Sequence, residues 1–453
     1  MEDFNIEKEL DSFRNLLKNK QYASLRGKAQ DMNNADVASV MEQMEDEDML
    51  KMFRLFPKEL AANVFALLEA DSQQYIITSL SDKEAGAVID NLYADDAADL
   101  LEEMPANVVK KLLANAKPET RNDINHLLQY PDDSAGSVMT VEFVDLMENM
   151  TVKEAIERIR KIGMDSETVN TCYVLNSKRL LLGTVALRYL IINDADKLIG
   201  DIMHEEVISC NTGTDQEAVA RIFQKYDFEA LPVVDKENRM VGIITVDDVL
   251  DIMEREATED FERMAAIIPG DKPYLRTGVL ETWKKRIPWL LLLMISATFT
   301  GRIITGFEDA LSRYIILSSF IPMLMDTGGN SGSQASAEVV RSLSLGQVEF
   351  KDLPKIIWKE MRVGLLCGLT LSIACFAKCM IMDQTSVPVA LTVCLTVICA
   401  VLFAKTAAST LVLVVSKMKL DPAVVASPML TTIIDAISLL IYFSIATAVL
   451  HLR

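Results

Sequence analysis

The feature that most constrains this chain is a set of long uncharged apolar runs in its last part. They cover 287–301, 363–377, 386–404 and 422–434, and several of them continue past a single charged residue. A helix needs about 20 predominantly apolar residues to cross the hydrocarbon core of a bilayer. We therefore predict that residues 283–453 form a helical membrane domain.

A fifth and more polar span is expected around 311–340. Its first half is apolar, whereas its second half is rich in Gly, Ser, Asn and Gln. Such a segment is too polar to face lipid but suits an aqueous path or a helix–helix contact. Five spans place the basic residues on one side of the membrane, with the amino terminus in the cytoplasm and the carboxyl terminus outside. These basic residues are Lys284, Lys285, Arg286, Arg341, Lys351, Lys355, Lys359, Arg362, Lys417 and Lys419.

The remainder of the chain is strongly acidic. Residues 1–282 hold 55 Asp and Glu against 30 Lys and Arg, whereas residues 283–453 hold 10 against 15. A negative field of this kind repels nucleic acid and attracts cations, so we expect no nucleic-acid partner. The first ten residues, MEDFNIEKEL, are acidic and amphipathic and do not resemble a signal peptide. We expect a multi-pass protein of the cell membrane with a large cytoplasmic part.

Composition also argues against several kinds of chemistry. The chain has three histidines and seven cysteines without a Cys-x-x-Cys pair, so imidazole-based metal sites and a disulfide framework are not expected. The sequence shows no nucleophile–base pair, no phosphate-cradling loop and no redox motif. We therefore predict that the protein is not an enzyme.

Residues 1–130 are predicted to be entirely helical. Apolar residues recur there at helical spacing between short breaks, without the alternation of strands. The segments SLSDKEAGAVIDNL and YADDAADLLEEMP are each expected to start a helix with Ser or Asp as its cap. Short helix pairs of this kind suit a small superhelical array, and an ordinary helical bundle is the alternative.

Residues 131–252 contain an internal repeat of β-α-β-β-α type, with copies near 137–200 and 201–252. The segments TCYVLNSKRLLLGTVALRYLI and ALPVVDKENRMVGIITVDDVL carry it, and the pattern resembles a tandem pair of cystathionine-β-synthase (CBS) domains. In that family such pairs bind nucleotides or ions. The resemblance places ATP or another adenine nucleotide at Thr245 and Asp248, whereas Ala186 and Tyr189 stand at the corresponding positions of the first copy.

One acidic residue lies within the last apolar span. Asp435 has roughly ten apolar-dominated residues on either side, and a carboxylate there is costly unless it faces water, a cation or a donor. A structural bridge to Lys405 is one interpretation, although Lys405 and Lys378 could also sit near span ends. The other is a cation site in a pore, where oxygen ligands favour magnesium, calcium or manganese. Pro428 is expected to loosen the helix near Asp435.

Three segments in the same order resemble the MgtE family of magnesium transporters along the whole chain. They are MDTGGNSGSQ, the span DPAVVASPMLTTIIDAISLLIYF, and YDFEALPVVD followed by TVDDVLDIMEREATED. The resemblance implies a helical domain, a CBS pair, a connecting plug helix within 253–282 and five membrane spans. It also implies a homodimer whose second and fifth spans line a Mg²⁺ pore. In this family, cytosolic Mg²⁺ at acidic sites closes the pore through the plug helix.

The resemblance carries metal-binding roles onto particular residues of this chain. Asp435 would be the pore carboxylate, with the backbone carbonyl of Thr431 beside it and Asp421 near the cytosolic mouth. The regulatory positions are Asp95, Asp99, Asp215, Glu217, Asp227, Asp248, Asp251, Glu256, Glu259 and Asp260. Two departures weaken particular contacts, because Asn63 replaces an expected carboxylate and Ser427 stands where an Asn often precedes the proline.

Three alternatives remain open on the sequence. Each acidic residue taken alone could belong to a solvated face. The transported ion could be another divalent cation, such as Co²⁺ or Mn²⁺. The cytoplasmic part could instead be a nucleotide- or ion-sensing module for which the membrane domain is only an anchor, although an anchor needs neither Asp435 nor a polar second span.

Overall fold

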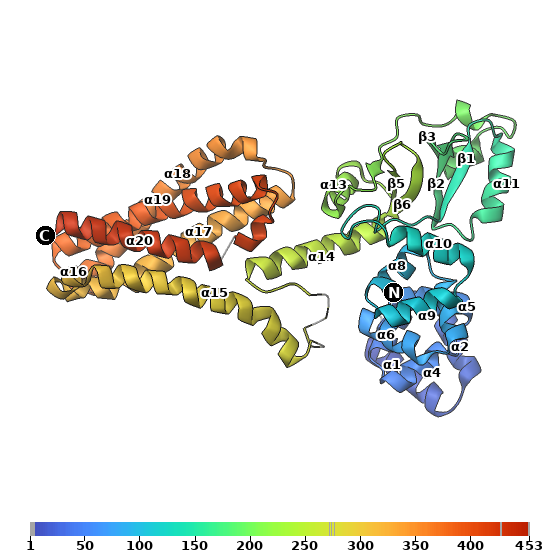
Figure 1. Ribbon diagram of the computed structural model, residues 1–453, viewed down its shortest axis with the longest axis horizontal. Helices are drawn as coiled ribbons and strands as arrows, with labels where there is room; N and C mark the ends of the chain where they lie inside the picture. Colours follow the sequence, from blue (N-terminus) through green and yellow to red (C-terminus); the bar gives the residue numbers. More distant parts are fainter. Residues whose placement is uncertain (1–4, 271, 273, 276, 426–427, 452–453) are drawn as a thin grey trace. The chain divides into compact units, whose positions relative to one another are not determined.

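A computed structural model describes residues 5–270, 272, 274–275, 277–425 and 428–451, apart from the side chains at 309, 310 and 425. The chain divides into two compact units, Met1–Asp251 and Ile252–Arg453 (Figure 1). Ser427, one of the two departures from the MgtE pattern, lies outside the described residues.

The first unit begins with helices only, as predicted. They pack around a shared core of Leu, Ile, Val, Met and Phe side chains, with Phe13 and Phe65 fully buried. Their bounds are α1 (Ile6–Lys18), α2 (Tyr22–Asp31), α3 (Asn34–Glu42), α4 (Asp46–Phe53), α5 (Lys58–Ala66), α6 (Ala70–Ser79), α7 (Asp82–Ile89), α8 (Ala94–Glu102), α9 (Ala106–Asn115) and α10 (Pro118–Leu127).

The predicted caps are right for one helix and wrong for the next. Ser81 caps α7, and the side chain of Glu84 accepts a hydrogen bond from the Ser81 backbone N–H, which completes a capping box. At α8 the cap position is Tyr93, without a side-chain hydrogen bond, and Asp95 and Asp96 fall in the first turn instead. Carboxylates in a first turn are favoured by the helix dipole, so these residues still mark the start of the helix.

The repeat forms two small sheets of the same design, as predicted. The first sheet has the order β1-β2-β3 and the second β4-β5-β6, and in each the first pairing is parallel and the second antiparallel. The elements are β1 (Phe143–Met147), α11 (Val152–Ile162), β2 (Thr168–Leu175), β3 (Leu181–Ala186), α12 (Leu187–Ile192), β4 (Cys210–Asn211), α13 (Gln216–Tyr226), β5 (Ala230–Val234), β6 (Met240–Thr245) and α14 (Val246–Met264).

The two copies share a core. Phe143 and Tyr173 of the first sheet pack with Met240 and Ile243 of the second. The backbone of Thr140 also exchanges hydrogen bonds of 2.8 and 2.9 Å with Ile243. The repeat therefore folds as one paired module.

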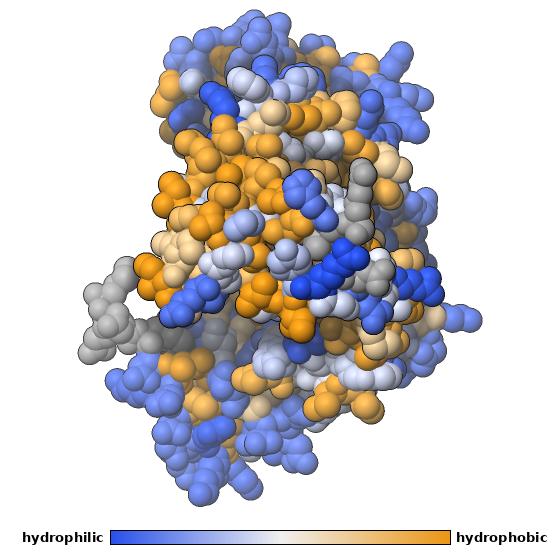
Figure 2. Space-filling model, turned by 90° about the vertical axis from the view of Figure 1, so that its left-hand side faces the viewer, coloured by the Kyte–Doolittle hydropathy of each residue, from blue (hydrophilic) through white to orange (hydrophobic). Residues whose placement is uncertain are grey.

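Among its described residues, the second unit holds four helices that are long and apolar enough to cross a membrane: α15 (Val279–Gly306), the helix pair η3–α18 (Phe350–Ile381), α19 (Val387–Lys417) and α20 (Pro428–Val449). Large apolar side chains on α15 and α18 are exposed, among them Phe299, Leu366 and Ile373, as a lipid-facing surface requires. In Figure 2, which views the molecule from the side of this unit, hydrophobic residues predominate on the near surface.

The region of the expected fifth span differs from the sequence-based prediction. Instead of one element over 311–340, the chain forms α16 (Glu308–Arg313), the 3₁₀ turn η2 (Ile315–Phe320) and α17 (Ile321–Ser344). Pro322 lies in the first turn of α17, where its missing N–H is not needed. The helix is present but begins later than expected, and it is not among the four apolar helices because of its Gly and Ser content.

Pro428 is the first described residue of α20, because residues 426 and 427 lie outside the described part of the chain. The hydroxyls of Thr431 and Thr432 donate to its carbonyl at 3.0 Å, which satisfies an acceptor of the first turn. Asp435 therefore lies two turns from the start of the described helix, not at its middle.

Candidate functional site

Asp435 and Thr431 lie one turn apart on the side of α20 that faces α17. A Cβ atom placed on Gly329 would lie 3.5 Å from the Asp435 carboxylate and 3.5 Å from the Thr431 side chain. At Gly332 it would lie 2.1 Å from the end of the Ile434 side chain, which would have to shift to make room. The glycines of MDTGGNSGSQ thus allow α17 to approach Asp435 closely, as small residues do at membrane helix contacts.

A row of polar side chains on α17 is exposed in the single chain. Every fourth residue belongs to it: Asp326, Asn330, Gln334 and Glu338. Asp435 itself is half-buried, and the charge of Asp326 acts on it. Sequence reasoning recognised this segment as polar but overlooked Asp326, although the spacing of four that places the row on one face is visible in the sequence.

Lys405 does not form the bridge to Asp435 that was considered. No ion pair between the described residues joins these two side chains. Lys405 is only 6% exposed within α19, and its charge acts on Glu360 of α18, which is 4% exposed. The expectation that Lys405 reaches a span end is therefore wrong, whereas Lys378 meets that expectation by pairing with Asp383 at 2.7 Å just after α18.

The first unit brings acidic residues of the helical domain and the CBS pair together. Asp95 of α8 is half-buried, and its desolvation raises its pKa well above the usual range, with the charge of Asp248 of α14 adding to this rise. Asp99 and Asp248 act on the neighbouring Asp96, and Asp251 acts on Asp248. Asp248 therefore repels Asp95 and is repelled by Asp251, whereas Asp99 acts on this group through Asp96.

Three members of this group were missed in the sequence. Burial and the charge of Asp248 raise the pKa of Asp96 to about 7 and that of Glu167 to about 8. Glu142, whose pKa is also raised by burial, accepts hydrogen bonds from Thr140 and from the backbone of Ala94. One carboxylate oxygen of Glu167 is buried without a hydrogen-bond partner. These side chains are half-buried, and we call Asp95, Asp96, Glu142, Glu167 and Asp248 together the buried acidic cluster.

The buried acidic cluster makes stability depend on pH in a definite direction. Its carboxyls bind protons more tightly when folded, so they stabilise the fold most below their ordinary pKa near 4, and this contribution is lost as pH rises toward about 8. In a chelator, we expect the melting temperature of the full chain to fall by several degrees between about pH 5 and pH 8. Millimolar Mg²⁺ should restore it at the higher pH. The double variant Asp96→Asn/Glu167→Gln should lose most of this slope, and an unchanged slope would contradict the assignment.

The other predicted regulatory residues have local roles. Asp215 caps α13 by accepting from the Glu217 backbone at 3.0 Å, and Glu217 lies 3.6 Å from Arg221. Asp227 ends the same helix in the left-handed conformation, with φ of 53°. Glu256 lies on α14. Among the described residues, no group of three His, Cys, Asp or Glu is arranged to hold a metal ion.

The proposed nucleotide residues contact each other. The hydroxyl of Thr245 donates to the Asp248 carboxylate at 2.5 Å, and the Thr245 backbone donates at 3.3 Å. Asp248, in the first turn of α14, thereby accepts from the residue before the helix while it belongs to the buried acidic cluster. A ribose or phosphate at this position would have to replace the Thr245 contact.

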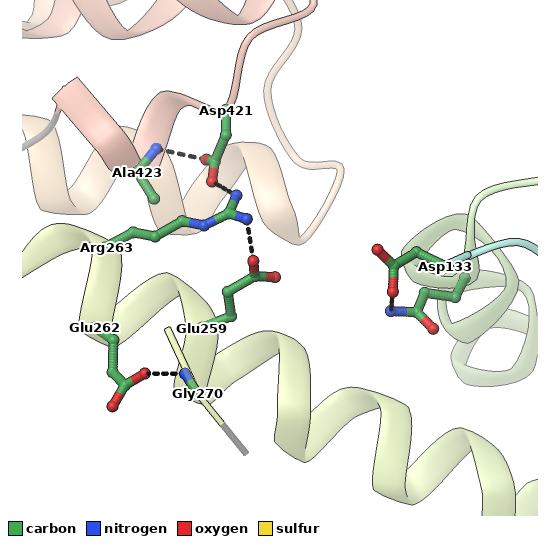
Figure 3. Close-up of polar contacts among 8 residues, drawn as sticks. Asp133, Glu259, Glu262, Arg263, Gly270, Asp421 and Ala423 are labelled. Carbon is green, nitrogen blue, oxygen red and sulfur yellow. Dashed lines mark hydrogen bonds and ion pairs between the residues drawn. The ribbon is translucent and has the colours of Figure 1, made fainter. Parts of the chain in front are cut away.

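The carboxyl-terminal end of α14 carries a second charged group, in the second unit. Arg263 donates one guanidinium nitrogen to Asp421 and another to Glu259, as Figure 3 shows. Ser344, the last residue of α17, donates to Asp260 at 3.1 Å. Burial and Asp421 raise the pKa of Asp260, and Arg263 opposes this. The predicted metal residues Asp421, Glu259 and Asp260 thus meet at Arg263, which the sequence reading missed.

Comparison with known proteins matches these parts in the same order. The model of the MgtE intracellular N domain matches residues 32–133, the CBS domain model matches 199–255, and the MgtE model, described as a divalent cation transporter, matches 321–445. The magnesium transporter MgtE of Thermus thermophilus is 35% identical over 433 residues, with 94% of this chain and 95% of that protein covered. The magnesium transporter MgtE of Bacillus subtilis is 32% identical over 428 residues, with 92% and 94% covered.

Two solved structures resemble the first part of the chain. A crystal structure of the soluble part of a magnesium transporter is 32% identical, with a TM-score of 0.53, and covers 56% of this chain and 100% of its own. The cytosolic domain of the Mg²⁺ channel MgtE in complex with ATP is 35% identical, with a TM-score of 0.51, and covers 54% and 99%. The chain therefore belongs to the MgtE family of magnesium transporters and is not an enzyme.

Proposed function

We propose that this protein conducts Mg²⁺ through a pore on the twofold axis of a homodimer, lined by α17 and α20. The observation that carries this proposal is the exposed polar row of α17 beside Asp435. Exposing these charged and amide side chains to lipid would carry a large unfavourable free energy. A second copy would cover this row and would place two rows and two Asp435 carboxylates around one path.

The chemistry of the site suits a hydrated divalent cation. Mg²⁺ gives up its water reluctantly, so a pore should hold it through water molecules and not by direct ligands alone. Asp435, the backbone carbonyl of Thr431 and the amides of the polar row offer only oxygen atoms or amide groups, which favour hard cations. The names of the relatives in Thermus and Bacillus support magnesium over cobalt or manganese.

Ion uptake into liposomes tests this proposal directly. Protein reconstituted at defined internal ion concentrations should carry Mg²⁺ faster than Ca²⁺, Mn²⁺ or Co²⁺. If Mn²⁺ or Co²⁺ is carried faster than Mg²⁺, the pore proposal still holds, but the transported ion is a different one. If none of the four cations is transported, the pore proposal fails, and the alternative of a sensing module with a membrane anchor is favoured.

The finer architecture belongs to the same proposal. We assign α17 as the second of five spans, because it packs against both α19 and α20. Five spans put the amino terminus in the cytoplasm and the carboxyl terminus outside. The domain limits proposed are 1–130 for the helical domain, 131–252 for the CBS pair, 253–282 for the connecting segment with the end of α14 as plug, and 283–453 for the membrane domain.

Cytosolic Mg²⁺ is proposed to close this pore. The buried acidic cluster supports a sensor, because its carboxylates repel one another until a cation or proton neutralises them. The acidic residues of α13 and α14 would contribute further weak sites. An adenine nucleotide at the CBS pair is supported by the ATP complex of the related cytosolic domain. Binding of ATP, measured by calorimetry and weakened by Thr245→Ala, would test that part.

The dimer makes a separate prediction. Asn330 lies in the exposed polar row, so Asn330→Cys should cross-link two chains in membranes when a short bifunctional thiol reagent is added. Leu366→Cys on α18 is the matched control, because Leu366 is also exposed (68%) but apolar and suited to lipid. We expect a strong dimer band for Asn330→Cys and at most a trace for the control. Equal bands for the two variants, or a chain that conducts as a monomer, would contradict the twofold pore.

A further inference from the structure

The end of α14 is fixed to the membrane unit by contacts that need no metal ion. Met264 packs against an apolar cluster formed by Val339, Val340, Val412, Leu413 and Ala423. Next to it, the guanidinium of Arg263 joins Asp421 and Glu259, and all three side chains are between a quarter and a third exposed. Because a guanidinium stays charged at every physiological pH, this contact does not depend on the protonation of Arg263.

Both helices proposed to line the pore are reached by these contacts. Asp260 of α14 accepts from Ser344 at the end of α17. Asp421 accepts from Arg263 with one oxygen and from the backbone of Ala423 with the other, at 2.7 Å, at the 3₁₀ turn η4 (Pro422–Val425) that precedes α20. Figure 3 shows Asp421 standing between Ala423 and Arg263. A change at Arg263 would therefore act directly on Asp421, which precedes α20, and through the neighbouring Asp260 on the end of α17.

The charges of this site explain why a cation is needed there. Three carboxylates, Glu259, Asp260 and Asp421, lie around Arg263, and Asp421 repels Asp260. Without a cation among them, the carboxylates on α14 would be pushed away from Asp421. A divalent ion could join them, but here a side chain of the same helix does so.

We propose that Arg263 is a tethered cation that holds the end of α14 on Asp421 in the absence of Mg²⁺ and so positions this helix for closure. This inference rests on the proposed function, in which α14 closes the pore. Regulatory Mg²⁺ then adds to a contact that already exists and does not create closure from a free helix. Arg263 is accordingly a positioning residue and not a ligand of the ion.

Hydrogen exchange in a chelator tests the contact without any ion flux. In the full-length protein in lipid nanodiscs, Arg263→Gln should speed exchange of the amides near the end of α14 by about two- to tenfold, the range expected when two partly exposed ion pairs are lost. Arg263→Lys should fall between the variant and the parent. Arg255→Gln is the matched control, because Arg255 is exposed on the same helix and the charge change is identical.

Ion flux supplies the second readout. Arg263→Gln should raise the internal Mg²⁺ needed for half-inhibition by about two- to fivefold, and it should have no further effect in the Asp421→Asn background, where its partner is gone. Unchanged exchange in Arg263→Gln, or full additivity with Asp421→Asn, would overturn the proposal. Wild-type protein without Mg²⁺ flux would instead defeat the proposed function, while the exchange result would still decide the role of Arg263.

Discussion

Asp435→Ala is expected to reduce Mg²⁺ flux by about a hundredfold or more while the protein stays folded and dimeric. Removing the carboxylate that compensates a partly desolvated cation costs about 3 kcal/mol, and each 1.4 kcal/mol is a factor of ten. A Cβ atom on Gly329 of α17 would lie 3.5 Å from the Asp435 carboxylate, so this carboxylate lies at the contact between α17 and α20. Uptake of Mg²⁺ into liposomes measures the effect.

Two comparisons make this result specific. Asp435→Asn keeps the size of the side chain and removes its charge, so its flux should be nearly as low as that of the alanine variant. Ser444→Ala alters the same helix at an exposed position where the hydroxyl only donates to the Leu440 carbonyl, and it should conduct normally. Normal uptake by Asp435→Ala would remove this residue from the mechanism.

The domain pattern could be predicted because each part has its own periodicity. Helical spacing identified the helices before Leu127, and a repeated strand–turn–strand pattern identified the two sheets. Errors arose where a single residue decides a boundary. Pro322 lies in the first turn of α17, a role for proline that apolar runs alone do not distinguish from a kink. Apolar length alone does not identify α17, because much of its buried face consists of Gly, Ser and Ala, and only its polar composition indicated a span there.

The sites could be predicted only where a charge contradicts its surroundings in sequence. Asp435 stands out among apolar neighbours, so the sequence was enough to find it. Glu167 and Asp96 look like ordinary surface residues in sequence, and their burial follows from packing between residues far apart along the chain. Arg263 is one basic residue in a charged helix, and its pairing with Asp421, 158 residues later, depends wholly on the tertiary fold.

Loss of inhibition by internal Mg²⁺ is the second large effect expected. Asp248→Asn together with Asp251→Asn removes both repulsion and ligands from the buried acidic cluster and its neighbour. Sites made of a few exposed or half-buried carboxylates bind divalent ions with dissociation constants of about 10⁻⁴–10⁻³ M, the range of a sensor for free Mg²⁺. Because several such sites favour the same closed state, each bound ion favours the next and the response should be steep. The double variant should need at least about tenfold more internal Mg²⁺ for half-inhibition.

Selectivity separates a defect in the sensor from damage to the pore. In the double variant, the preference for Mg²⁺ over Ca²⁺ should match that of the parent, since Asp435 and α17 are unchanged. Asp194→Asn/Asp196→Asn removes two exposed acidic charges from the first CBS copy and should leave inhibition as it is. Glu259→Gln/Asp260→Asn changes the carboxylates around Arg263 and should also weaken inhibition. If Asp248→Asn/Asp251→Asn is still shut off at the parent's Mg²⁺ concentration, the buried acidic cluster only holds the fold and the pore is regulated elsewhere.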